Sequence, residues 1–459
     1  MYQIDFANPV HVHFMGIGGI SMSGLAEILL DAGFTVSGSD QKCSPLTEHL
    51  EKMGAKISYS QIADDIESGI DLVVYTAAIS CDNPELLEAK KQNIPTMSRA
   101  ELLGQIMKNY PMPIAISGTH GKTTTTSMIS EILLDADVDP TLSIGGILKS
   151  IGGNIRVGKS DYFVTEACEY TNSFLSFFPK ISIILNIEED HMDFFKDIHD
   201  IRNSFHRFAK LLPEDGYLII NSEIENLSEL TSDLACRVIT VGKDKNADYT
   251  YTNASFDELG RGTYTLVKKG VASEQVSLGV VGEHNITNSL AVLALMDILG
   301  IPKESVLKSL KKFTGTDRRF EYKGVVNGVT ILDDYAHHPT EITATLTAAQ
   351  NYPHKNLWVV FQPHTYTRTK AFLKDFAKAL SISDKVILTD IYAAREKNTI
   401  GISSKDLLTE LQTYGKECYY FSSFEEIEKF LLKNCINGDL LITMGAGDVV
   451  KIGENLLAK

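Results

Sequence analysis

The residues with the clearest chemical meaning lie between positions 114 and 126, where an apolar run is followed by glycines, a lysine and hydroxyl side chains. The segment after the run reads Gly118-Thr119-His120-Gly121-Lys122-Thr123-Thr124. Glycines let backbone N–H groups turn toward an anion, and the start of the following helix adds partial positive charge. Lys122 can reach the β- and γ-phosphates of a nucleotide, and the Thr123 hydroxyl can hold Mg²⁺. The segment therefore predicts a phosphate-binding loop.

This loop is shorter than the general nucleotide-binding pattern, because Ile116 stands where G-x-x-x-x-G-K-[ST] has a glycine. The alternative is an ordinary glycine-containing turn between a strand and a helix. Because Gly121-Lys122-Thr123 directly follows an apolar strand, the pattern favours phosphate binding.

Two further polar side chains follow apolar runs. Glu166 ends the run 161–165, and His191 lies shortly after the run 181–186. Ligands of open parallel sheets collect at the carboxyl ends of the strands, so both side chains should lie on the same side of the sheet as Lys122. The alternatives are a surface carboxylate for Glu166 and a capping or core histidine for His191.

A second glycine cluster lies near the start of the chain. Residues 10–15 alternate like a strand, Gly16 and Gly18 follow, and Asp40 ends the next apolar run. This order resembles a dinucleotide-binding fold, although Ser21 replaces the third glycine of the fingerprint. The cluster indicates a backbone close to a phosphate more than it indicates a nicotinamide cofactor.

The elements that must position these groups alternate between strand and helix patterns. Apolar strands at 329–332, 357–361, 385–388 and 440–443 predict a further open α/β sheet, and 247–281 has an antiparallel pattern. The expected fold class is α/β with three domains: a Rossmann-like N-terminal domain, a central P-loop ATPase-type domain and a Rossmann-like C-terminal domain. The expected boundaries are 1–110, 111–315 and 316–459, with hinges at 110–113 and 314–316.

The composition excludes several classes of protein. A length of 459 residues suggests two to four domains, and 44% hydrophobic with 22% charged residues is typical of globular chains. The sequence has no 18-residue apolar span and no basic-then-apolar start, so we expect a cytoplasmic protein without a membrane partner. Six widely separated cysteines argue against a zinc site or a disulfide framework. The net charge of −16 argues against nucleic acid as a partner.

Taken in order, the motifs resemble those of the Mur ligase family along the whole chain. They are Gly16-Ile17-Gly18-Gly19, Gly118 to Thr124, Glu166-Ala167-Cys168-Glu169, Asn186 with Asp190-His191, Asn285 with Asn288, Arg318-Arg319-Phe320, Asp334-Tyr335-Ala336-His337-His338-Pro339 and Gln362-Pro363-His364. The first-region glycines and His337-His338-Pro339 are similar to those of the member that adds L-alanine to the lactyl carboxylate of UDP-N-acetylmuramate, with ATP and Mg²⁺, for peptidoglycan. The resemblance implies an acyl phosphate intermediate.

The resemblance also implies roles for individual residues. ATP would contact Gly118, Thr119, His120, Gly121, Lys122, Thr123, Thr124, Asn288, Arg319 and Asp334. The UDP-sugar would contact Gly16, Gly18, Gly19, Ser21 and Asp40, and metal ligands would be Thr123, Glu166 and His191. The catalytic set would be Lys122, Glu166, His191, His337, His364 and Arg368, with a histidine orienting or deprotonating the amine. Thr365 stands where many relatives have arginine, which leaves Arg368 as the expected clamp for the L-alanine carboxylate.

Three other interpretations remain open at this point. A ligase recycling a murein tripeptide would use the same UDP-sugar, a nicotinamide-dependent oxidoreductase would use only the first glycine cluster, and a nucleotide-binding regulator would bind ATP without turnover. The sequence leaves open whether the chain is a monomer or a homodimer.

Overall fold

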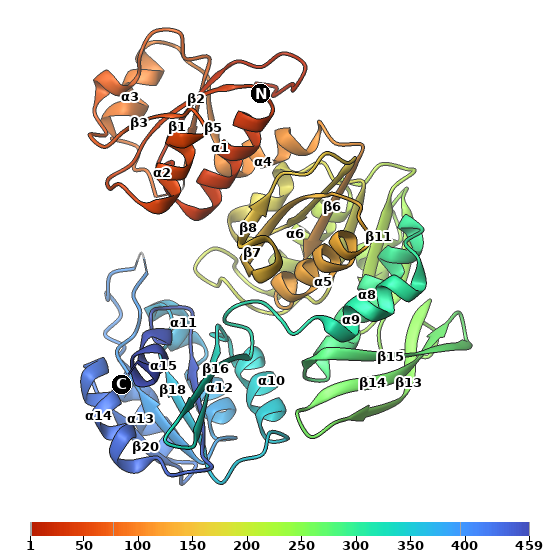
Figure 1. Ribbon diagram of the computed structural model, residues 1–459, viewed down its shortest axis with the longest axis vertical. Helices are drawn as coiled ribbons and strands as arrows, with labels where there is room; N and C mark the ends of the chain where they lie inside the picture. Colours follow the sequence, from red (N-terminus) through yellow and green to blue (C-terminus); the bar gives the residue numbers. More distant parts are fainter. Residues whose placement is uncertain (1, 77, 395, 459) are drawn as a thin grey trace.

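The computed structural model describes residues 2–76, 78–394 and 396–458. Within these residues the chain forms three β-sheets of five, ten and six strands, each flanked by helices (Figure 1). We call them the first, central and last sheets. They confirm the α/β class and the two Rossmann-like ends predicted from the sequence. The domain boundaries themselves stay a prediction.

The first sheet is parallel throughout, with the order β3-β2-β1-β4-β5. Its strands are β1 His11–Met15, β2 Thr35–Ser39, β3 Lys56–Ser58, β4 Leu72–Tyr75 and β5 Thr96–Ser98. Its helices are α1 Ile20–Asp31, α2 Pro45–Lys52, η1 Ala63–Asp65, α3 Pro84–Lys91 and α4 Arg99–Met107. The predicted glycine cluster lies between β1 and α1.

The central sheet has the order β15-β14-β13-β12-β11-β10-β6-β9-β7-β8, with the apolar strand β6 inside it. Its strands are β6 Met112–Ser117, β7 Thr141–Leu148, β8 Gly153–Arg156, β9 Tyr162–Glu166, β10 Ile181–Ile184, β11 Tyr217–Asn221, β12 Arg237–Val241, β13 Tyr249–Phe256, β14 Arg261–Lys268 and β15 Val271–Val281. Its helices are α5 Lys122–Asp135, η2 Lys149–Ile151, η3 Tyr170–Ser176, α6 Ile198–Ala209, α7 Leu227–Thr231, α8 His284–Leu299 and α9 Lys303–Lys312. Strands β13 to β15 are antiparallel, as predicted.

One hinge expectation needs correction here. Met112 and Pro113, expected in a linker at 110–113, are the first two residues of β6. Proline is tolerated at a strand start because its missing N–H removes only one ladder bond at the edge of the pairing.

The last sheet has the order β16-β17-β21-β18-β19-β20, parallel except for the hairpin of β16 with β17. Its strands are β16 Glu321–Val326, β17 Val329–Asp334, β18 Leu357–Phe361, β19 Lys385–Leu388, β20 Glu417–Tyr420 and β21 Leu440–Met444. Its helices are α10 Pro339–Ala349, α11 Tyr366–Ala371, α12 Leu373–Leu380, α13 Ser404–Gln412, α14 Phe424–Asn434 and α15 Val450–Leu457. The edge strands β16 and β20 were not predicted, because they are short and carry polar or half-exposed side chains.

The first and central sheets share one apolar core, to which both Phe14 of β1 and Phe163 of β9 belong. Among the described residues, the core around the last sheet is made only of residues from Phe320 onward. The last sheet therefore meets the central one mainly through the polar contacts described below. Such interfaces are typical of parts that move relative to one another.

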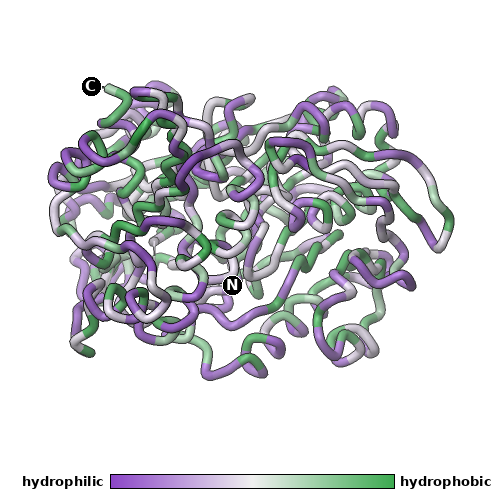
Figure 2. The backbone as a smooth tube through the Cα atoms, turned by 90° about the horizontal axis from the view of Figure 1, so that it is seen from below, coloured by the Kyte–Doolittle hydropathy of each residue, from purple (hydrophilic) through white to green (hydrophobic). Residues whose placement is uncertain are grey.

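Apolar and polar segments alternate along the whole backbone (Figure 2). No helix in the described ranges combines the length and the apolar content needed to cross a bilayer.

Candidate active site

The predicted phosphate loop connects β6 to α5. Gly118 has φ 140° and Gly121 has φ 86°, backbone angles that a side chain would strain. Gly121 also lies against Asn288, whose Oδ1 would be 3.0 Å from an added Cβ. The strand, loop and helix follow one another as predicted, and α5 begins at Lys122 with its N-terminus at the loop.

The Lys122 ammonium folds back over this loop. Its Nζ donates to the carbonyl oxygen of Thr119 at 3.1 Å and to Glu169 Oε2 at 3.0 Å. Burial by itself lowers the pKa of Lys122, but the neighbouring Glu169 carboxylate outweighs burial and raises the pKa. The side chain therefore keeps a fixed positive charge where the terminal phosphates of a nucleotide would lie. The role of Glu169 beside Lys122 was missed, because only the fold brings the two residues together.

Thr123 and Glu166 come together as expected from the sequence. Thr123 Oγ1 donates to Glu166 Oε2 at 3.1 Å, and the amide of Gly145 donates to Glu166 Oε1 at 2.6 Å. Burial raises the pKa of Glu166. A hydroxyl and a carboxylate are the oxygen ligands that Mg²⁺ prefers, so the residues present fit this ion. Gly145 of β7 is a site residue that sequence reasoning missed, although a Gly-Gly pair in a strand often marks a close approach.

His191 lies on the same side of the sheet, in a left-handed backbone conformation with φ 55°. Its Nε2 is 3.8 Å from both Glu169 and Asp190, and its ring packs on Tyr170 with centroids 4.6 Å apart. Burial lowers the pKa of His191, so the ring is predominantly neutral at pH 7. Glu169 therefore connects Lys122 to His191.

A cavity of about 210 Å³ opens beside the phosphate loop between the central and last sheets. It is lined by six of the predicted ATP residues: His120, Gly121, Thr124, Asn288, Arg319 and Asp334. Asn288 Nδ2 donates to Asn285 Oδ1 at 2.9 Å, so the two amides of α8 face it as a pair. His284, which also lines the cavity, was not predicted.

The Asp334 carboxylate was expected to contact ATP, but its oxygens are already engaged. They accept hydrogen bonds from the amides of Phe320 at 2.8 Å and Ala336 at 2.7 Å and from Thr345 Oγ1 at 3.2 Å. Burial raises the pKa of Asp334 to about 6. Asp334 therefore holds together the loop segments that contain Phe320 and Ala336 in the cavity wall.

His120 of the phosphate loop lies between two carboxylates that were absent from the predicted site. Its Nε2 is 3.5 Å from Glu188, and its Nδ1 is 3.4 Å from Glu341 of α10. Burial lowers the pKa of His120, yet the two carboxylates outweigh this and raise it to about 9. His120 therefore connects the loop to the last sheet.

A second cavity, of about 460 Å³, is lined by His191 together with His364, Thr365 and Arg368. Arg368 donates from Nε and Nη2 to Asp190 Oδ1 at 3.1 and 2.8 Å. Two of its donors already bind Asp190, so the carboxylate clamp predicted for Arg368 would have to use the remaining N–H groups of the guanidinium, and it stays a prediction. The charge of Arg368 still lies at the cavity wall, and it outweighs burial to lower the pKa of Asp190.

The two predicted histidines of the last sheet lie near each other, with ring centroids 5.6 Å apart. His337 Nδ1 is 3.1 Å from the carbonyl oxygen of Tyr335, and His364 Nδ1 is 3.0 Å from Arg368 Nη1. Burial, together with the neighbouring His337 and Arg368 side chains, lowers the pKa of His364 to about 3. A general base works best near the operating pH, so this pKa argues against His364 as the histidine that deprotonates the amine. Because Arg368 Nη1 can only donate, His364 Nδ1 is the acceptor, and the proton of the neutral ring lies on Nε2, which can donate to a substrate oxygen.

The predicted UDP-sugar residues lie apart from both cavities, at the carboxyl ends of β1 and β2. Gly18 N–H donates to Asp40 Oδ2 at 2.8 Å, and Gly16 has φ 79°. Gly19 is exposed just before α1, and Ser21 is exposed in its first turn. Asp40, expected beside the uridine, thus also fixes the glycine loop.

Comparison with known proteins agrees with this arrangement along the whole chain. Three family models match: "Mur ligase family, catalytic domain" at 11–111, "Mur ligase middle domain" at 116–296 and "Mur ligase, glutamate ligase domain" at 318–447. The chain is 61% identical to a UDP-N-acetylmuramate–L-alanine ligase of Agathobacter rectalis, with full coverage of both chains. It is 52% identical to the enzyme of that name from Acetivibrio thermocellus, covering 100% of this chain and 98% of the relative.

Two solved structures share the complete fold. A UDP-N-acetylmuramate–alanine ligase of Thermotoga maritima superposes with a TM-score of 0.80 at 30% identity, and a murein peptide ligase of Psychrobacter arcticus with 0.70 at 25%. Each comparison covers 98% of both chains. Because three family models match the chain and a relative is 61% identical over its full length, the chain belongs to the Mur ligase family.

Proposed function

We propose that this chain is an ATP-dependent ligase that joins L-alanine to the lactyl carboxylate of UDP-N-acetylmuramate, in the cytoplasm, for peptidoglycan precursors. The observation that carries the proposal is the position of Glu169, which contacts Lys122 of the phosphate loop and lies 3.8 Å from His191 at the wall of the second cavity. A nucleotide phosphate on the loop would therefore lie next to an amino-acid site. The full-length relatives named for this reaction support it.

In the first step a carboxylate attacks the γ-phosphate of ATP, so one anion approaches a polyanion. Charge neutralisation and alignment are then the main catalytic tasks. Lys122 supplies a fixed positive charge, and the loop amides orient the phosphates. Mg²⁺, held by Thr123 and Glu166 with His191 as a candidate ligand for a second ion, would neutralise further phosphate charge.

In the second step the amine of L-alanine displaces phosphate from the acyl phosphate. Arg368 presents positive charge to the amino-acid carboxylate, and the Nε2–H of the neutral His364 can donate a hydrogen bond to a substrate oxygen. The polar contacts between the central and last sheets close the two cavities around the reacting groups. Closure protects an acyl phosphate from hydrolysis.

The whole proposal predicts that phosphate release requires UDP-N-acetylmuramate, ATP, Mg²⁺ and L-alanine together. Omitting any one of the four should reduce release to background, and a murein tripeptide should not replace L-alanine. A coupled phosphate assay over the omission series measures this. Equal release with the tripeptide would assign the chain to recycling, and turnover with a nicotinamide cofactor and no ATP would contradict the proposal.

The glycine loop of the first sheet gives a separate prediction: Gly18→Val should weaken UDP-sugar binding and leave ATP binding nearly intact. A Cβ at Gly18 would lie 2.9 Å from Asp40 Oδ2 and 3.0 Å from Thr47 Cγ2, so the loop must shift. Calorimetric titrations with each ligand measure both affinities. Weaker ATP binding with unchanged UDP-sugar binding would move the nucleotide site to the first sheet.

Gly19→Ala is the matched variant, because its added Cβ meets nothing closer than 3.5 Å within the protein. A loss of UDP-sugar affinity in this variant would show that the ligand itself approaches the loop backbone. Unchanged affinity in Gly19→Ala would indicate that Gly18→Val weakens UDP-sugar binding only by distorting the loop.

A further inference from the structure

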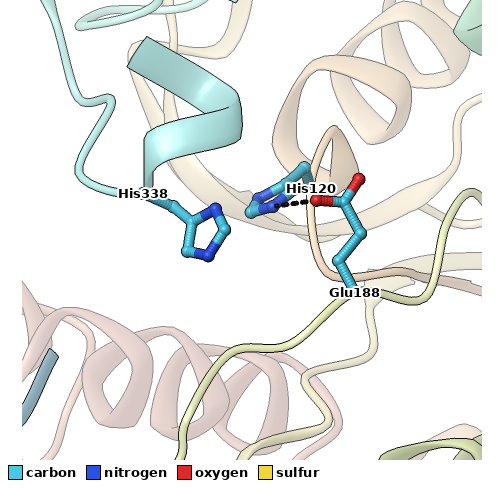
Figure 3. Close-up of side chains that lie close together, drawn as sticks. All are labelled: His120, Glu188 and His338. Atoms are coloured by element: carbon cyan, nitrogen blue, oxygen red, sulfur yellow. Dashed lines mark ion pairs between the residues drawn. The ribbon is translucent and has the colours of Figure 1, made fainter. Parts of the chain in front are cut away.

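Three side chains outside the predicted magnesium positions meet where the central and last sheets face each other. They are His120 of the phosphate loop, Glu188 after β10 and His338 just before α10 (Figure 3). Each offers one ligand atom, and these atoms lie within 4.8 Å of one another. We propose that they form a binding site for a transition-metal ion of the Zn²⁺ class that joins the two parts of the chain.

The spacing between His120 and Glu188 suits two ligands of one ion. His120 Nε2 and Glu188 Oε2 are 3.5 Å apart, which exceeds the roughly 2.7–2.9 Å of a charge-assisted hydrogen bond. Two atoms held about 2.0–2.1 Å from a tetrahedral ion are about 3.3–3.4 Å apart. His120 Nε2 is shielded from solvent and lies at ion-pair rather than hydrogen-bond distance from Glu188, so an ion bound there would displace a proton from the ring.

The surrounding groups orient all three side chains. Glu341 Oε1 lies 3.4 Å from His120 Nδ1, so the ring is placed between a carboxylate and the proposed ion, as is usual for metal-bound histidines. The Thr340 hydroxyl donates to Glu188 Oε2 at 2.7 Å. The carbonyl oxygen of Glu189, 3.0 Å from His338 Nε2, favours a proton on that nitrogen. The Nδ1 lone pair accepts the helix-capping hydrogen bond of the Thr340 amide at 3.3 Å, so an ion at Nδ1 would replace this bond.

The donor set selects the kind of ion. Two imidazoles and one carboxylate, with a fourth position for water, suit Zn²⁺, and the site contains no cysteine. Mg²⁺ prefers oxygen ligands in octahedral geometry, so excess Mg²⁺ should not displace the transition metal. Because His120 and Glu188 also line the cavity assigned to ATP, an ion here would restrain the nucleotide site as well as the interface.

The test is a Zn²⁺ titration of the full-length chain without nucleotide, in excess Mg²⁺, by competition with a chromophoric chelator. We expect one ion per chain, and affinity at least about 10–100-fold weaker in both His338→Gln and Glu188→Gln. His206→Gln is the matched control. His206 lies outside the proposed site, where its Nε2 is 2.8 Å from Asp233 Oδ1, so this substitution should leave the Zn²⁺ affinity unchanged. Wild-type affinity in folded His338→Gln, or no bound ion in wild type, would overturn the proposal.

Co²⁺ substitution gives a second readout that does not depend on affinity. The visible spectrum should report tetrahedral nitrogen and oxygen ligands in wild type, and this signal should disappear in Glu188→Gln. A thiolate charge-transfer band would place the ion at a cysteine, and a tetrahedral spectrum unchanged in Glu188→Gln would place it elsewhere. Either result would overturn the assignment, and far-UV circular dichroism of each variant establishes that it is folded.

Discussion

Replacing Lys122 with alanine is expected to lower turnover by at least about a hundredfold, the scale of losing one preorganised donor to developing charge. The ammonium is buried in the loop and is held by the carbonyl oxygen of Thr119 and by Glu169. Among the described residues, Lys122 is the only lysine or arginine that forms an ion pair with Glu169. Steady-state phosphate release at saturating substrates measures the loss.

The same substitution should also reduce stability, because it leaves the buried Glu169 carboxylate without its counter-charge. Breaking a buried ion pair costs about 3–5 kcal/mol. The double variant Lys122→Ala with Glu169→Gln separates the two effects, since it should regain stability in denaturant unfolding and remain inactive. Near-wild-type turnover in either folded variant would refute the assignment of the phosphate loop.

Arg368→Ala is expected to raise the KM for L-alanine by roughly ten- to a hundredfold, the equivalent of about 1.5–3 kcal/mol for a charge-assisted contact. Arg368 is 9% exposed and Asp190 6% exposed, so the variant also leaves a buried carboxylate unpaired. Its free energy of unfolding should therefore fall by about 3–5 kcal/mol. Arg368→Lys should recover only part of the affinity, because an ammonium lacks the planar arrangement of donors.

Asp190→Asn tests whether Arg368 acts through its ion pair with Asp190 or through the carboxylate of L-alanine. The substitution weakens the ion pair that holds Arg368 against Asp190 but leaves the guanidinium at the cavity wall. The KM for L-alanine should therefore change less than in Arg368→Ala. The KM for UDP-N-acetylmuramate should change little in either variant. If Arg368→Ala raised the KM for ATP alone, Arg368 would be a phosphate contact and the amino-acid carboxylate would bind elsewhere.

The parts of the site that the sequence predicted are those encoded by neighbouring residues. The apolar run 114–116, two glycines and Lys122 specify a strand, a loop and a helix start without help from the rest of the chain. The position of Glu166 followed from the rule that parallel strands end at one edge, and its contact with Thr123 agrees with that rule.

The missed parts depend on contacts between distant residues. The pairing of Asp190 with Arg368 spans 178 residues, and the contact of His338 with Glu189 spans 149. No local sequence pattern predicts these contacts. The sequence therefore suggested that Arg368 was unpaired and available to the L-alanine carboxylate. The low pKa of His364 likewise follows from burial beside His337 and Arg368, which only the folded chain creates.

In the proposed reaction, a carboxylate of UDP-N-acetylmuramate is activated by phosphoryl transfer from ATP and then joined to L-alanine. The most direct measurement uses UDP-N-acetylmuramate carrying ¹⁸O in its lactyl carboxylate, with ATP, Mg²⁺ and L-alanine, and mass spectrometry of both products. The account predicts one ¹⁸O transferred to each phosphate released and an L-alanyl amide on the UDP-sugar. Unlabelled phosphate, or phosphate release without the amide, would contradict it.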